Sequence, residues 1–168
     1  MAYELKPCAV FDALALAQQW YPNKKLQHAL KVAEYAVLRW TGVFNKEEID
    51  SDVIPVMPEG AMEELWVVYF IGLFHDIVED SECPIDSIYA FFAKYFDIEY
   101  AAAAVKSLAI LTHKEGESYA DYMRILLNSN DRYAKHIKSA DMKDHWMRKD
   151  TLSDKLIEKY KPYVGLLM

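Results

Sequence analysis

An uncharged stretch of nine residues, 66–74, runs directly into a group of ionisable side chains, and this junction constrains the fold more than any other segment. The stretch reads Trp-Val-Val-Tyr-Phe-Ile-Gly-Leu-Phe, so a helix made from it is apolar on every side and belongs in the interior. It is far too short to cross a bilayer. His75, Asp76, Glu79 and Asp80 follow within six positions. Buried charges need partners, so these groups must pair with each other, with a cation or with water.

The composition predicts a globular, all-α protein with a single domain over residues 1–168. Hydrophobic residues make up 53% of the chain and aromatic residues 14%, which is enough for a full core. Five glycines and the lack of a useful alternating pattern argue against an all-β fold. A net charge of −7 without a Lys/Arg block argues against binding to nucleic acid or to an anionic membrane surface.

The remaining bulk features favour a cytoplasmic protein. Cys8 and Cys83 lack the spacing of a metal site, and we interpret them as reduced thiols. The apolar segment near the N-terminus is interrupted by Asp12, which argues against a signal peptide. No segment is long enough to span a membrane. The sequence leaves the oligomeric state open, including a homodimer.

Apolar spacing, capping residues and prolines divide the chain into helices. One long connection, 41–60, interrupts them between the second and the central helix. Connections of this length are often lids or binding loops, and a plain surface insertion with a short helix near 46–51 is the alternative. The expected helices span residues 7–20, 24–40, 61–78, 84–95, 98–111, 119–127, 132–149 and 152–160. Ser118 can cap the helix that runs to about residue 127, and the polar turn 128–131 ends that helix and can cap the next.

A metal site at the His75-Asp76 doublet would need further ligands from other helices, because one helix cannot surround an ion. His28, in the first turns of the second helix, and Asp141, on a late helix, are candidates. Asp141 lies between Ile137 and Trp146 and is expected to be partly buried. A buried aspartate usually has a cation or hydrogen-bond donors close by.

These residues resemble a known family, the HD-domain metal-dependent phosphohydrolases. The family pattern is a His, then a His-Asp doublet, then a late Asp, and here it matches His28, His75-Asp76 and Asp141 over about residues 20–150. The segment 75–80, His-Asp-Ile-Val-Glu-Asp, is similar to the HDxxED signature of the Rel/Spo-type alarmone hydrolases. Lys-Ser-Ala-Asp at 138–141 is similar to their late Lys-x-Ala-Asp motif.

The resemblance implies a role for each matching residue. His28, His75, Asp76 and Asp141 would bind one divalent cation, with Mn²⁺ as the first expectation. Mixed imidazole and carboxylate ligands also suit Fe²⁺, Zn²⁺, Co²⁺ or Mg²⁺. Glu79 and Asp80 would orient and deprotonate the attacking water.

Several positions depart from the family pattern or leave their role open. Ala29 stands where the alarmone hydrolases carry Pro, and His145 stands where they carry Asn. One turn beyond Asp141, His145 could contact substrate, add a ligand or lie outside the site. Lys138 could hold phosphate or pair with a carboxylate. The alarmone hydrolases carry an Arg that packs against guanine, and this chain has no clear counterpart of it. Lys25 is a candidate for binding substrate only because it lies near His28 in the sequence.

We therefore expect a metal-dependent phosphohydrolase whose partner is a small phosphorylated nucleotide, first of all guanosine 3′,5′-bis(diphosphate). A 5′-nucleotidase-like phosphomonoesterase and a non-catalytic helical binding domain are the alternatives. His113 and His136 are expected to have no role in the site. Tyr119 and Arg124 could face substrate, or serve as an ordinary packing residue and a surface charge.

Overall fold

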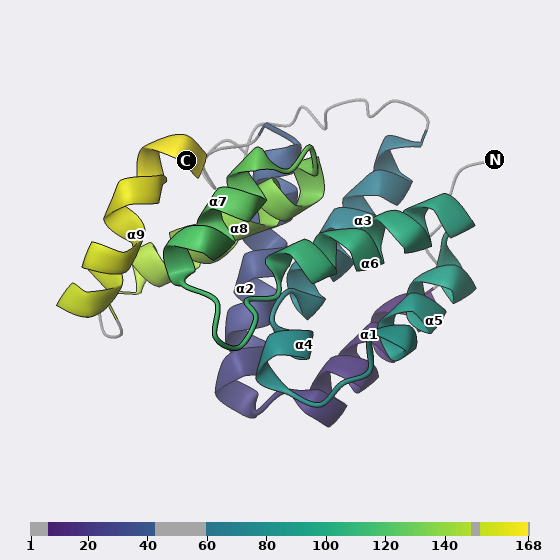
Figure 1. The fold of residues 1–168 in the computed structure, drawn as a ribbon. Coiled ribbons are helices and arrows are strands. Elements are labelled where there is room, and N and C mark those ends of the chain that lie inside the picture. The colour runs from purple at the N-terminus through teal and green to yellow at the C-terminus, as the bar shows by residue number, and fades with distance from the viewer. Residues whose placement is uncertain (1–6, 43–59, 149–151, 168) are drawn as a thin grey trace, which may run out of the picture.

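The structure is a computed structural model that describes residues 7–42, 60–148 and 152–167. Within these ranges it is entirely helical, without a strand (Figure 1), so the predicted all-α class is confirmed. The helices are α1 (Pro7–Trp20), α2 (Asn23–Trp40), α3 (Ala61–Phe74), α4 (Ile77–Asp80), α5 (Ile85–Tyr95), α6 (Ile98–Leu111), α7 (Tyr119–Asn128), α8 (Arg132–Met147) and α9 (Asp154–Leu167).

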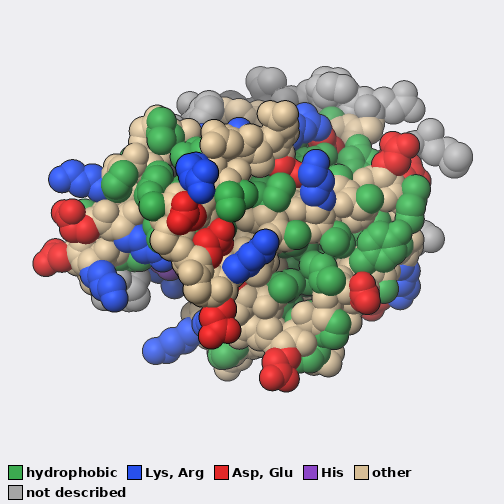
Figure 2. Space-filling model, viewed as in Figure 1, with side chains coloured by type: hydrophobic (Ala, Val, Ile, Leu, Met, Phe, Trp, Pro, Cys, Tyr) green, Lys and Arg blue, Asp and Glu red, His purple; other side chains and the backbone are tan. Residues whose placement is uncertain are grey.

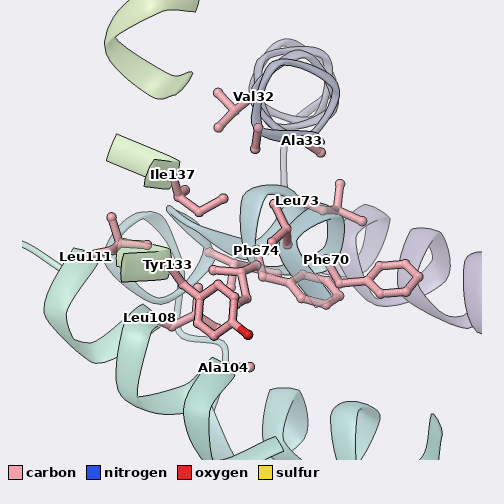
Figure 3. Close-up of a cluster of buried hydrophobic side chains, with 14 of the residues drawn as sticks. Val32, Ala33, Phe70, Leu73, Phe74, Ala104, Leu108, Leu111, Tyr133 and Ile137 are labelled. Atoms are coloured by element: carbon pink, nitrogen blue, oxygen red, sulfur yellow. The ribbon is translucent and has the colours of Figure 1, made fainter. Parts of the chain in front are cut away.

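The apolar helix α3 lies at the centre and contacts α1, α2, α6 and α8. All of residues 66–74 are buried except Trp66 and Tyr69, which are half-buried. Figure 3 shows Phe70, Leu73 and Phe74 of α3 gathered with apolar side chains from α2, α6 and α8. The burial of this core fixes the end of α3 deep in the molecule, and that end carries the His75-Asp76 doublet.

A glycine allows α2 and α3 to approach each other closely. A Cβ on Gly72 would lie 2.8 Å from the Ala33 Cα, which is too short for any real Cβ contact. The crossing point lies between one and one and a half helical turns from His28 on α2 and about one turn from His75 after α3. Gly72 therefore brings the two histidines within reach of each other.

The central helix ends at Phe74, so the prediction of one helix through residue 78 was wrong. The Gly72 carbonyl accepts a hydrogen bond from the His75 ring Nδ1 (2.8 Å), while the Asp76 amide donates to the Tyr21 hydroxyl (3.2 Å). Asp76, with φ −104° and ψ 0°, lies at the margin of the right-handed helical region and forms the N-cap of the next helix. The chain then forms the short helix α4, in which the Asp80 amide donates to the Asp76 carbonyl.

The last helix is longer than the sequence predicted. We expected it to end near residue 160, before an apolar tail, but α9 continues through Pro162 to Leu167. Leu167 is buried, and its carbonyl accepts a hydrogen bond from the Arg39 guanidinium of α2 (2.6 Å). Packing and this bond outweigh the helix-ending tendency of proline.

The cap predicted at Ser118 is confirmed, and in the turn 128–131 it is Asp131 that caps α8. The Ser118 hydroxyl accepts from the Asp121 amide, and the Asp131 carboxylate accepts from the Ala134 amide. Most of the connection 41–60, including the predicted short helix near 46–51 and any lid, lies outside the described residues.

Charges of both signs are interspersed over the face shown in Figure 2, and neither sign gathers into one large patch there. Among the described residues, none of the helices has the length and the apolar character needed to cross a membrane.

Candidate metal centre

Three helical segments that are far apart in the sequence bring their ligand atoms together at one point. His28 comes from α2, His75 follows α3 and Asp141 comes from α8. One ligand atom from each residue lies within 4.8 Å of the other two, and all three residues are buried. The structure therefore confirms that His28 and Asp141 meet the His75-Asp76 doublet.

Hydrogen bonds fix the tautomer of both imidazoles. The His75 Nδ1 faces the Gly72 carbonyl at 2.8 Å, and a carbonyl can only accept, so Nδ1 must carry the proton. The His28 Nδ1 donates in the same way to the Asp144 carboxylate at 2.6 Å. In the neutral rings, both Nε2 lone pairs are free to bind a cation. This pairing of a histidine ligand with a carboxylate or carbonyl behind it is typical of metal sites.

The atoms that face one another have no hydrogen-bond partner among the described residues. These are the Nε2 atoms of His28 and His75 and the Asp141 Oδ1, all of them buried. The Asp141 Oδ1 lies 3.2 Å from the His28 Nε2 and 3.9 Å from the His75 Nε2, but neither contact has hydrogen-bond geometry. Two imidazole nitrogens and a carboxylate oxygen without partners fit the needs of a divalent cation.

Asp76 completes the group on its more open side. Its Oδ2 lies 3.2 Å from the His75 Nε2 and 3.9 Å from the His28 Nε2. The side chain is 28% exposed, whereas the other three members are almost fully enclosed. Water or substrate can therefore reach the centre from the side on which Asp76 lies.

The charges within the group are strongly coupled. Burial lowers the pKa of His28, but the close Asp141 carboxylate, the Asp144 carboxylate that binds its Nδ1 and the charge of Asp76 outweigh burial and raise the pKa to about 9. Burial raises the pKa of Asp141, but the Lys138 ammonium and the nearby imidazoles hold it well below its ordinary value. The carboxylates thus stay ionised, in the form that binds a cation.

His145 lies against the centre. Its Nε2 is 3.2 Å from the Asp141 Oδ1, and its ring centre lies 4.6 Å from that of His28. The side chain is 30% exposed. His145 therefore does not lie outside the site. The two alternatives that remain for it are a metal ligand and a contact to substrate.

Both candidate substrate lysines are paired with carboxylates. The Lys138 Nζ lies 2.8 Å from the Asp141 Oδ2 and is almost buried, as the pairing alternative expected. The Lys25 Nζ lies 2.5 Å from the Asp80 Oδ1, at the open side of the centre.

The carboxylates of α4 are not among the ligand atoms that meet at the centre, although Asp80 lines a small pocket together with His28, His75 and Asp76. Glu79 accepts a hydrogen bond from the His113 amide at 2.9 Å, and Asp80 is held by Lys25. Both remain exposed beside the doublet. Because the predicted helix is interrupted after Phe74, Glu79 and Asp80 belong to the separate helix α4.

Sequence reasoning assigned no role to Asp144, although it is 3% exposed and holds His28 in place. Its position three residues after Asp141 was the available signal, since such neighbours share one side of a helix. Tyr21, whose hydroxyl binds the Asp76 amide, had no signal in the sequence. The histidines without an expected role both bind backbone carbonyls, His113 that of Glu117 and His136 that of Ala36.

Arg124 is exposed and pairs with Asp121, as the surface-charge alternative expected. Comparison of the chain with protein-family models, with curated proteins and with solved structures gives no match. The geometry of the centre is therefore the ground on which a function has to be argued.

Proposed function

We propose that this chain is a metal-dependent phosphohydrolase of the HD-domain type that acts on a phosphorylated nucleotide. The observation that carries the proposal is the inward direction of two imidazole Nε2 lone pairs, each fixed by a hydrogen bond that the Nδ1 of the same ring donates. Asp141 and Asp76 supply carboxylate oxygens to the same point. A purely structural cluster would have no need to keep these buried atoms without hydrogen-bond partners.

The proposed cation is Mn²⁺, held by His28, His75, Asp76 and Asp141. When bound, such a cation lowers the pKa of a bound water and offsets the charge that develops on phosphate oxygen. The mixed nitrogen and oxygen donors also accommodate Fe²⁺, Zn²⁺ or Co²⁺, and Mg²⁺ less readily.

Glu79 is the proposed general base. Its exposed carboxylate is oriented by the His113 amide, and its charge acts on Tyr122 and Lys159 together with that of Asp76. Glu79 lies three residues after Asp76 in the chain, on the short helix α4 that follows the doublet. Glu79 would accept the proton of the water that attacks phosphorus, while the bond from phosphorus to the leaving oxygen breaks. Asp80 would support this arrangement through its pair with Lys25.

A nucleotide panel tests the proposal. The protein is incubated with Mn²⁺ and with nucleoside monophosphates, diphosphates, triphosphates and guanosine 3′,5′-bis(diphosphate), and the products are separated. We expect hydrolysis of the bis(diphosphate) with release of pyrophosphate. Release of orthophosphate from monophosphates would instead identify a phosphomonoesterase. The panel is repeated with Fe²⁺, Zn²⁺, Co²⁺ and Mg²⁺. No turnover of any nucleotide with any of these metals or with Mn²⁺ would leave a metal-binding helical domain.

A further inference from the structure

An aromatic wall from α7 and α9 flanks the metal centre. Tyr160 of α9 places its ring centre 5.8 Å from that of His145. Tyr119 of α7 contacts Tyr160 and Tyr163, with ring centres 6.1 Å and 5.8 Å apart. Figure 1 shows α9 beside α7 and α8. Because His145 lies 3.2 Å from Asp141 and its ring contacts Tyr160, this wall stands on the Asp141 side of the centre.

Two lysines approach this wall, but they are in different situations. The Lys138 Nζ is 6.0 Å from the centre of the Tyr119 ring and the Lys159 Nζ is 4.2 Å from it. The charge of Lys138 is already balanced by Asp141 at 2.8 Å. Lys138 is therefore a poor candidate for binding a substrate phosphate, because that contact would have to compete with a buried ion pair.

Lys159 has no carboxylate partner among the described residues and is exposed. It is held over the Tyr119 ring by a cation–π contact. Burial of part of the side chain, followed by the nearby Lys138 charge, lowers its pKa. Its contact with Tyr119, and the contacts of Tyr119 with Tyr160 and of Tyr160 with His145, place Lys159 on the wall that flanks the metal centre. The charges of Asp141, Glu79 and Asp76 also act on its ammonium.

The Tyr119 hydroxyl provides a second polar group at this wall. It is buried and has no hydrogen-bond partner among the residues that the structure describes. A hydroxyl in this state is costly unless a ligand or water satisfies it. An ammonium and a hydroxyl on one wall are the donors that an anionic oxygen requires.

We propose that Lys159 and the Tyr119 hydroxyl form an anion subsite beside the metal centre, which binds the phosphate of the substrate that is not attacked. The inference rests on the proposed function and narrows its substrate to a nucleotide with a diphosphate group. One phosphate would lie at the metal centre and the other against Lys159. A monophosphate would leave this subsite empty.

Inorganic pyrophosphate is the probe, used with metal-free protein so that binding is measured without turnover. Isothermal titration is carried out on the wild type, on Lys159→Met, on Tyr119→Phe and on Lys155→Met as the control. Lys155 is an exposed lysine one turn earlier on α9. We expect Lys159→Met to weaken binding about tenfold or more and Tyr119→Phe by a smaller factor. Lys155→Met is expected to bind as the wild type does.

Equal binding by the wild type and Lys159→Met, or no binding by the wild type, would overturn the subsite. The nucleotide panel separates this outcome from failure of the proposed function. Pyrophosphate binding that depends on Lys159, without hydrolysis of any nucleotide, would keep the subsite and reject the hydrolase. If Lys159→Met hydrolyses a diphosphate-bearing nucleotide with an unchanged KM, the hydrolase is kept and the subsite is rejected.

Discussion

Asp144 shows how a single side chain outside the ligand set controls the centre. It accepts the His28 Nδ1 proton at 2.6 Å and also contacts the Arg148 Nε at 2.7 Å. The carboxylate fixes the ring orientation and makes Nε2 the metal-binding nitrogen. Groups in this position commonly change metal affinity by roughly 10- to 100-fold when they are replaced.

We therefore predict that Asp144→Asn weakens Mn²⁺ binding by about 10- to 100-fold while the ligands themselves are intact. The measurement is a competition titration with a metal-sensitive dye. Asp86→Asn is the matched control, because it removes one exposed carboxylate on α5 without touching the centre. Equal affinities for the two variants would show that Asp144 does not support His28.

Glu79→Gln tests the proposed base. The amide keeps the shape and the hydrogen bond from the His113 amide, but it cannot take a proton at neutral pH. We expect unchanged Mn²⁺ binding and a loss of about 10²- to 10⁴-fold in kcat. Glu82→Gln, an exposed residue just after α4, serves as the control. Wild-type turnover by Glu79→Gln would remove Glu79 from the mechanism.

His136 makes the free energy of unfolding depend on pH, and this dependence does not involve the metal centre. Burial lowers its pKa from the ordinary 6.5, and its Nε2 donates to the Ala36 carbonyl at 2.7 Å. Below the ordinary pKa the unfolded chain takes up a proton that the folded chain resists. This group therefore stabilises the fold above about pH 6.5, and the contribution is lost as the pH falls towards its lower folded pKa.

The expected result is that His136→Gln costs less free energy of unfolding at about pH 5.5 than at about pH 7.5. Urea unfolding of both proteins with a chelator present measures the two differences. If the cost of the substitution is the same at both pH values, the protonation of His136 does not affect the stability.

At the scale of helices, the crossing of α2 and α3 sets the distance between the two histidines. Gly72 is the contact point, because its missing side chain lets the Ala33 backbone come close. Its carbonyl also accepts the His75 Nδ1 proton, so a shift of either helix would disturb the centre. The geometry of the site therefore depends on one small residue in an otherwise large-residue helix.

Gly72→Ala is predicted to destabilise the protein by about 1–3 kcal/mol, because an added methyl group overpacks the crossing. It should also weaken metal binding. Gly165→Ala is the control, since a Cβ on this helical glycine of α9 meets no atom within 4 Å. That control should be neutral or stabilising by up to about 1 kcal/mol. Equal melting temperatures for the two variants would contradict the account of the crossing.

Helix boundaries show what local pattern can and cannot predict. Apolar spacing and capping residues located most of the helices, including the caps at Ser118 and Asp131. The end of α3 could not be predicted, because it depends on bonds from the His75 ring to Gly72 and from the Asp76 amide to Tyr21. The length of α9 depends on a distant bond to Arg39. Tertiary contacts decided both boundaries.

For the molecule as a whole, the sequence predicted the convergence of His28, His75, Asp76 and Asp141, and the structure confirms it. Resemblance to a motif supplied the pairing of distant residues that helical spacing alone could not. It could not supply Asp144 or the wall around Tyr119, because these follow from how α7, α8 and α9 pack. The nucleotide and the native metal stay predictions.

The central claim is that three helices bind one dication, and metal content after equilibration with Mn²⁺ and gel filtration tests it most directly. The account predicts one Mn²⁺ per chain for the wild type and almost none for folded His28→Ala and Asp141→Ala variants. Circular dichroism would confirm that these variants remain helical. A wild type without bound metal, or an Asp141→Ala protein that keeps its Mn²⁺, would contradict the account.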